Sequence, residues 1–141
     1  MKAKKITAKR TFVVRLERGD EVLGKLGEFC NSNVVESCMV YGIGALSHAK
    51  IFSVQDSEKF AVHEQTIEKP MELISALGNI TRNEAGKPLV HLHVCLGLPD
   101  HTTIGGHLLE GTISYTGEFF IIETEKIIKS KQGEELLLMK I

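Results

Sequence analysis

The chain has 141 residues, of which 43% are hydrophobic and 25% are charged, a profile typical of one globular domain with a single core. Its 17 Lys and Arg residues are balanced by 18 Asp and Glu residues, for a formal net charge of -1, which argues against a general polyanion-binding domain. No uninterrupted apolar stretch approaches the roughly 18 to 20 residues that a membrane helix needs, so we expect no membrane partner.

The cysteines Cys30, Cys38 and Cys95 are odd in number, and none lies in a Cys-x-x-Cys pair. This pattern is typical of thiols that pack as small hydrophobic side chains in a reducing compartment. We therefore predict a cytoplasmic protein with neither a disulfide framework nor a thiolate zinc site.

The first ten residues carry five basic side chains and no acidic one. We place a basic N-terminal arm at residues 1–9 and a single domain at 10–141, because no linker, repeat or low-complexity segment divides the rest of the chain. No Arg-Gly-Arg-Pro hook for the DNA minor groove accompanies the arm, so we interpret it as a solvated terminus. Residues 11–16, which are β-branched and aromatic, predict the first strand.

A helix is predicted after this strand. Apolar residues from Val22 to Cys30 recur with a period of about 3.6 residues, and the polar run at 31–33 ends the pattern. Asp20 precedes the pattern and is the expected N-cap.

Beyond the helix, the period of the apolar residues changes to about 2, which predicts strands. Such segments lie at 34–41, 49–54, 60–67, 71–80, 88–96, 108–115 and 119–124, and 134–141 is a further candidate. The connections that contain Gly42, Gly44 and Gly117, and the one at 83–86, are short enough to be turns between antiparallel neighbours. We therefore predict an α+β domain that is dominated by an antiparallel sheet.

Three histidines form the candidate site. In a strand over 88–96, His91 and His93 project from the same face, with Cα atoms about 6.6 Å apart, which lets two ring nitrogens converge on one ion. His107 follows after a loop, and the preceding Gly105 and Gly106 have no Cβ and allow a tight backbone approach. If the two segments pair as hairpin neighbours, the three imidazoles converge.

Three neutral imidazoles leave zinc a fourth, open position, as in catalytic or ligand-binding zinc sites. The ion keeps its full charge in such a site, so we expect a small anionic ligand. Imidazole also suits other divalent transition metals. The alternative is that these histidines are ordinary sheet residues with satisfied hydrogen bonds.

Three further residues are candidates for an outer layer of this site. Glu110 could orient a ligand, although strict alternation puts it on the face opposite His107. Glu72 lies in an apolar strand, where burial would raise its carboxyl pKa towards the range useful for proton transfer. His101 lies in the loop between the ligands and could line the mouth of the site.

Four blocks of sequence carry a family resemblance. They are Gly-Ile-Gly-Ala-Leu at 42–46, Met-Glu-Leu-Ile-Ser-Ala-Leu-Gly-Asn-Ile at 71–80, His-Leu-His-Val-Cys-Leu-Gly at 91–97 and Ile-Gly-Gly-His-Leu-Leu-Glu-Gly at 104–111. In this order they resemble the signature blocks of the plant and prokaryote conserved (PPC) domain, and the resemblance extends from about residue 10 to about residue 125. The chain is most similar to prokaryotic members, because it contains no AT-hook.

The resemblance implies an antiparallel sheet of about seven strands flanked by helices, assembled as a homotrimer. It also implies a zinc-type site on His91, His93 and His107. Plant members join the domain to an AT-hook, and prokaryotic members are often described as predicted DNA-binding proteins. The loop after the second histidine, at 97–101, departs from the usual Gly-Asp-x-Asp-Gly. The architecture also resembles acetolactate decarboxylase, a likeness of fold that implies no reaction.

Three functional hypotheses follow. The first is a homotrimeric metal-binding protein, with zinc or another divalent transition metal on the three histidines and an open position for a small anion. The second is a DNA-binding or regulatory protein that uses the basic arm. The third is a metal-dependent hydrolase or lyase in which Glu72 or Glu110 moves a proton.

Overall fold

The computed structural model describes residues 1–56, 61–132 and 136–140. The strands are β1 (Ala8–Glu17), β2 (Ser37–Asp56), β3 (Ala61–Ile67), β4 (Met71–Arg82), β5 (Pro88–Gly97), β6 (Thr103–Thr124), β7 (Lys129–Gln132) and β8 (Leu136–Met139), and the helix is α1 (Val22–Ser32). Six strands form the main sheet in the order β1-β6-β5-β4-β2-β3, and β7 and β8 form a separate hairpin. All of these pairings are antiparallel.

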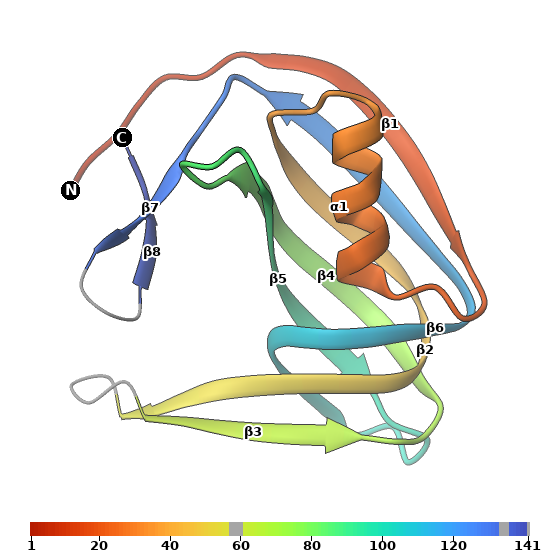
Figure 1. Cartoon of the computed structure of the whole chain (residues 1–141). Coiled ribbons are helices and arrows are strands. Elements are labelled where there is room, and N and C mark those ends of the chain that lie inside the picture. The colour runs from red at the N-terminus through yellow and green to blue at the C-terminus, as the bar shows by residue number, and fades with distance from the viewer. Residues whose placement is uncertain (57–60, 133–135, 141) are drawn as a thin grey trace.

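The main sheet closes on itself, and the helix packs against its bent face. Strand β2 pairs with both β4 and β6, β6 also pairs with β5, and β5 pairs with β4. These four strands form a closed cycle, and α1 lies in the bend of the sheet between β1 and β5 (Figure 1). Leu26 and Cys30 of α1 are fully buried, and the rings of Phe29 and Phe12 meet edge to face at 5.2 Å.

The predicted antiparallel sheet is confirmed, but the flanking helices are not. Within the described residues α1 is the one α-helix, so the domain is richer in β-structure than the predicted α+β domain. The reason is the length of two strands: β2 has 20 residues and β6 has 22. Each of them spans a stretch that the sequence divided into separate shorter strands.

The turns predicted at Gly42, Gly44 and Gly117 are wrong, because all three glycines lie inside long strands. A Cβ on Gly42 would lie 2.5 Å from Cδ1 of Phe119, and a Cβ on Gly44 would lie 2.5 Å from the carbonyl oxygen of Thr116. These glycines therefore allow β2 and β6 to approach each other closely. In sequence, a glycine that forms a turn cannot be distinguished from a glycine that allows two strands to approach closely.

Helix α1 covers the predicted residues, but its N-cap is Glu21 rather than Asp20. The Glu21 carboxylate accepts hydrogen bonds from the N–H groups of Leu23 and Gly24, at 3.3 and 2.6 Å. The Asp20 carboxylate instead accepts from the N–H of Glu17 at 2.8 Å and belongs to the turn before the helix. The longer glutamate side chain reaches the free N–H groups of the first turn.

The three cysteines are free thiols, as predicted, and Cys30 and Cys38 are buried in the core. In the described part of the chain, no helix is long and apolar enough to cross a membrane.

Strand β5 places the candidate site on the outer face of the sheet. Leu92, Val94 and Leu96 are buried on its inner face, whereas His91 is half-buried and His93 is exposed on the other. This alternation is the one predicted, and the inner leucines are core residues on which the register of β5 depends.

We expect Leu92→Ala to lower the free energy of unfolding by about 2 to 5 kcal/mol, because it opens a cavity under a side chain that is 0% exposed. Urea denaturation followed by circular dichroism measures this loss. Leu138→Ala is the matched control, since Leu138 is 42% exposed and should cost less than half as much. Equal losses in the two variants would contradict the burial of β5.

Candidate metal centre

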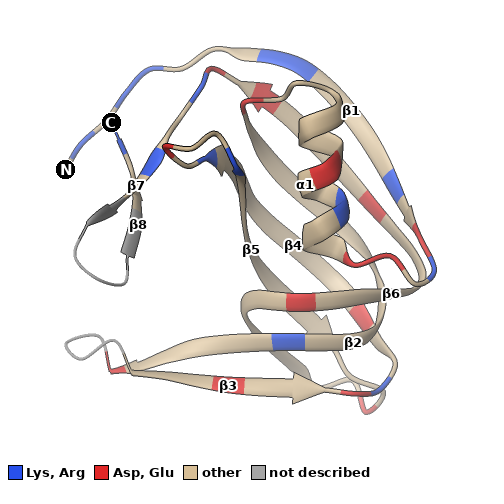
Figure 2. Ribbon diagram, in the orientation of Figure 1, with Lys and Arg blue, Asp and Glu red and all other residues tan. Residues whose placement is uncertain are grey.

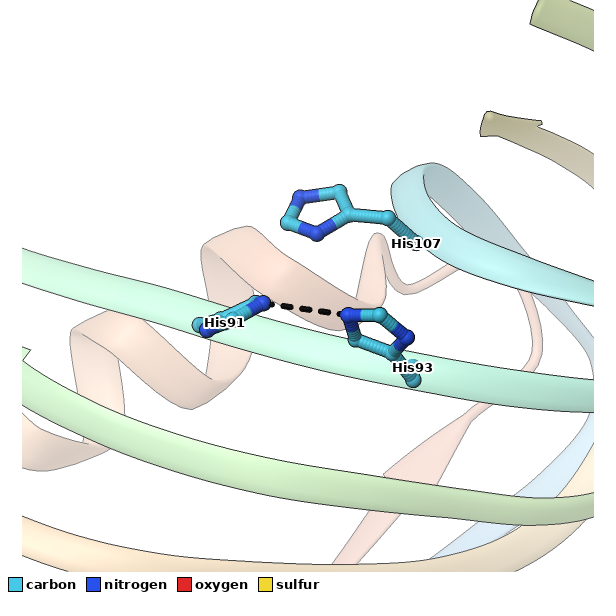
Figure 3. A group of neighbouring side chains, drawn as sticks. All are labelled: His91, His93 and His107. Carbon is cyan, nitrogen blue, oxygen red and sulfur yellow. Dashed lines mark hydrogen bonds between the residues drawn. The ribbon is translucent and has the colours of Figure 1, made fainter. Parts of the chain in front are cut away.

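The three predicted histidines come together on the outer face of β5 and β6 (Figure 3). His93 lies directly opposite His107 in the β5–β6 pair. The ring centroids are 5.1 Å apart for His91 and His93, 4.8 Å for His91 and His107, and 5.4 Å for His93 and His107. One ring nitrogen from each residue lies within 4.8 Å of the other two.

Two glycines allow His107 to reach this position. A Cβ on Gly105 would lie 2.5 Å from the carbonyl oxygen of Val94 in β5, and a Cβ on Gly106 would lie 2.5 Å from the carbonyl oxygen of Phe52 in β2. The Gly-Gly pair therefore lets β6 fit between β5 and β2. The hairpin pairing on which the sequence prediction depended is the one that the structure shows.

The aromatic ring of Phe52 forms one wall of the cluster. It stacks on His107 with ring centroids 4.5 Å apart and an interplanar angle of 30°. Phe52 pairs with His107 across β2 and β6, so its place follows from strand register. The contact holds the His107 ring in one orientation and shields one side of it from water.

A lysine that the sequence analysis missed lies against the cluster. The Lys129 ammonium donates to Oδ1 of Asn79 at 2.9 Å and lies 3.3 Å from Nδ1 of His91. Its residue is only 6% exposed. Asn79 faces His91 across β4 and β5. No local pattern marks Lys129, which looks in sequence like one more charge of a Lys-rich C-terminal stretch.

The environment keeps two of the imidazoles neutral. Burial, and then the positive charge of Lys129, lower the pKa of His91 from the usual 6.5 to about 4. Burial and the neighbouring His93 lower the pKa of His107 as well. Neutral imidazole is the form that binds a metal ion, so both rings have a free nitrogen lone pair at neutral pH.

The geometry fits a divalent transition metal. Tetrahedral zinc with Zn–N bonds of about 2.0 to 2.1 Å places ligand nitrogens roughly 3.3 Å apart. The Nε2 atoms of His91 and His93 are 3.2 Å apart, close to this separation, and one ring nitrogen from each of the three histidines lies within 4.8 Å of the other two. The residues present could therefore hold such an ion through three nitrogens.

The structure does not bring the other candidates to the cluster. Glu110 accepts from His48 at 3.3 Å, and Glu68 contacts the other nitrogen of that ring at 2.8 Å. Glu72 lies opposite Gly97, four residues along β5 from His93, a separation of about 13 Å.

Glu72 and His101 line a separate depression of about 250 Å³ at the start of β4, which Tyr115 also lines. Within the described residues, the metal-ligand group that contains His91, His93 and His107 has no carboxylate member. Glu72, Glu110 and His101 therefore lie at other places on the sheet and are not members of the histidine cluster.

Known proteins share this fold. The chain matches the family model of the Plants and Prokaryotes Conserved (PCC) domain over residues 3–125. A plant- and prokaryote-conserved (PPC) protein from Pyrococcus horikoshii is 32% identical, with a TM-score of 0.89, and the match covers 100% of this chain and 98% of that one. No curated protein matches.

Two further solved structures are similar. A protein from Archaeoglobus fulgidus described as metal-containing is 26% identical over the whole of both chains, with a TM-score of 0.88. A protein from Bacteroides thetaiotaomicron whose name proposes DNA binding is 24% identical over 96% of each chain, with a TM-score of 0.85. The second likeness shows the fold alone.

The fold and the matched length define a PPC-type domain. The chain belongs to the plant and prokaryote conserved domain family, as the four sequence blocks predicted.

The metal-free protein should lose stability as the pH falls from about 6.5 to about 4, the interval between the usual and the folded-state pKa of His91. In this interval the unfolded chain binds a proton that the folded chain excludes, so acid favours unfolding. Thermal melts at stepped pH measure the effect. His91→Gln should flatten this part of the curve, whereas the exposed control His63→Gln should leave it unchanged; parallel curves for wild type and His91→Gln would contradict the assignment.

Proposed function

We propose that this protein is a metal-binding module that holds a zinc-type ion through His91, His93 and His107. The observation that carries the proposal is the convergence of three ring nitrogens, one from each residue, within 4.8 Å. Two of the rings have a lowered pKa, which favours the neutral, ligating form. The Archaeoglobus fulgidus relative, described as metal-containing, adds support.

An open coordination position follows from the ligand set. Three nitrogen ligands leave one position of a tetrahedral ion for a small molecule. Such an ion, when bound, supplies a positive charge that attracts a carboxylate or phosphate oxygen. The free thiols fit the reducing cytoplasm, where we place the protein.

Purified wild-type protein should contain about one equivalent of a divalent transition metal per chain, because three ligands are preorganised. Elemental analysis after exhaustive dialysis measures the content. Alanine variants of His91, His93 and His107 should each lose most of it, and His63→Ala is the control with the same loss of an imidazole from an exposed strand. Equal metal content in all five proteins would overturn the proposal.

We also propose that the protein assembles as a homotrimer through the outer face of the sheet. Val13, Phe120, Tyr41 and Leu77 form one row of directly paired residues that ends at His93. Val13 and Leu77 are 66% and 59% exposed. The neighbouring Met39 and Ile43 extend this apolar face.

Monomeric proteins rarely expose a contiguous apolar area of this kind. A second copy seated on this face would remove it from water. In a cyclic trimer, each copy would present this face to a different patch of the next copy, and the ring would close after three such contacts. Because Leu77 is the cross-strand neighbour of His93, the partner copy would lie at the edge of the metal centre.

Leu77→Asp should convert the trimer to monomers, since it buries a charge in the interface at a high desolvation cost. Sedimentation equilibrium measures the mass. Val62→Asp places the same charge on the exposed edge strand β3 and should leave the trimer intact. A wild-type protein that sediments as a monomer would contradict the assembly.

DNA binding is the second candidate, and the observation in its favour is the basic arm beside the charged segment that leads into β7 (Figure 2). Several of these charges are already paired. Arg10 binds Glu123, Lys126 binds Glu36 and Lys140 binds Glu84. These pairs leave the lysines of residues 1–9 as the main source of phosphate contacts. Loss of DNA binding on deletion of residues 1–9, with a steep salt dependence, would support this function.

Of the three functional hypotheses, the metal-dependent hydrolase or lyase has the least support. It requires a group that moves a proton beside the ion. Glu72 and Glu110 lie elsewhere on the sheet, as described above, so neither serves in this role without a rearrangement of the fold.

A further inference from the structure

Lys129 is the residue of the cluster that the proposed metal site does not explain. It begins β7 and lies beyond the stretch that matches the family model, residues 3–125. Its side chain crosses from the β7–β8 hairpin to the outer face of β4 and β5, where its ammonium group contacts Asn79 and His91.

The ammonium group is buried among neutral partners. Its two contacts are an amide oxygen and an imidazole nitrogen, and no described carboxylate forms an ion pair with it. Burial is the cause of its lowered pKa. A buried cation whose described contacts are all neutral is unfavourable, so this position attracts an anion.

The contact between Lys129 and His91 also disfavours binding of a metal ion. The Nε2 atoms of His91 and His93 face each other, which leaves Nδ1 of His91 directed at Lys129. When Nε2 binds a metal, Nδ1 of the neutral ring carries the proton and must donate. Metal-binding histidines usually donate this proton to a carboxylate, a carbonyl or water. Here it meets Lys129, which is itself a donor and carries the same sign of charge as the ion.

An anion resolves both conflicts. A divalent ion and the Lys129 ammonium together place three positive charges in a site whose described metal ligands are all neutral histidines. An anion with two negative charges can bind the open position of the ion and screen Lys129 at once. The coupling between two ligands is reciprocal. The bound anion therefore raises the affinity for the ion by the same factor by which the bound ion raises the affinity for the anion.

We propose that Lys129 is the anion-selecting residue of the metal centre: it weakens binding of the bare ion and favours a small anion of charge two or more, such as a dicarboxylate or a phosphate. This inference rests on the proposed metal site. It makes ion binding and anion binding cooperative, and it assigns the specificity of the open position to a residue of the C-terminal hairpin.

The test compares wild type with Lys129→Met and Lys129→Arg. Competition with a chromophoric chelator measures the affinity for Co²⁺, and the visible spectrum of the Co²⁺-loaded protein measures the affinity for malonate and for acetate. Lys129→Met should bind bare Co²⁺ about 3- to 10-fold more tightly and malonate about 10-fold more weakly, since one nearby positive charge is removed. Its preference for malonate over acetate should fall by a similar factor.

Two controls separate charge from structural damage. Lys129→Arg keeps the charge and should stay within about 3-fold of wild type for malonate. Lys126→Met removes the same charge from an exposed lysine that pairs with Glu36, and it should change neither affinity. The opposite signs expected for Lys129→Met, tighter ion and weaker anion, are not produced by a distorted site, which weakens both.

The outcomes distinguish the inference from the function on which it rests. A wild-type protein that binds no Co²⁺ overturns both. A wild-type protein that binds Co²⁺ through the three histidines, together with a Lys129→Met variant that has unchanged affinities or loses both in parallel, overturns the role of Lys129 alone.

Discussion

Strand β6 is paired with three other strands, β1, β2 and β5, and this arrangement determines both the closure of the sheet and the position of the candidate site. It requires that main chains approach more closely than side chains normally permit. Gly105 and Gly106 on β6, and Gly42 and Gly44 on β2, meet this requirement, since a Cβ at each would lie within 2.5 Å of a neighbouring strand or its side chain. The same pairing that closes the sheet brings His107 opposite His93.

The candidate site lies on the outer face of a sheet whose inner face is apolar. Leu92, Val94 and Leu96 anchor β5 in the core, which leaves the alternate positions free to carry polar side chains. The site thus uses the rigidity of a buried sheet without placing charged groups in its core. Burial of His91 and His107 is partial, which is enough to lower the pKa of both rings and favour their neutral form, whereas His93 is exposed.

Two features that share this outer face have different physical origins. The apolar row from Val13 to Leu77 is exposed, and it is the surface through which we propose that copies of the chain assemble. The cluster beside it combines three imidazoles with the buried ammonium of Lys129, which we propose selects an anion. Because Leu77 and His93 are cross-strand neighbours, assembly and ligand binding would meet at one boundary of the sheet.

The sequence by itself determined the features that depend on local periodicity. Alternation placed His91 and His93 on one face with Leu92 and Val94 on the other, the period of the apolar residues located α1, and the order of four short blocks identified the family. These signals are strong because side-chain direction follows from the backbone of a single strand or helix.

Only the tertiary structure decided the features that depend on which strands meet. It showed that Gly42, Gly44 and Gly117 lie within long strands, that Glu110 contacts His48 and that Glu72 lies about 13 Å along the sheet from His93. It also brought Lys129 to His91, 38 residues away in the chain. Strand register and the path of a terminal hairpin are set by packing between distant segments. The local sequence around any one of these residues therefore does not predict which segments it will contact.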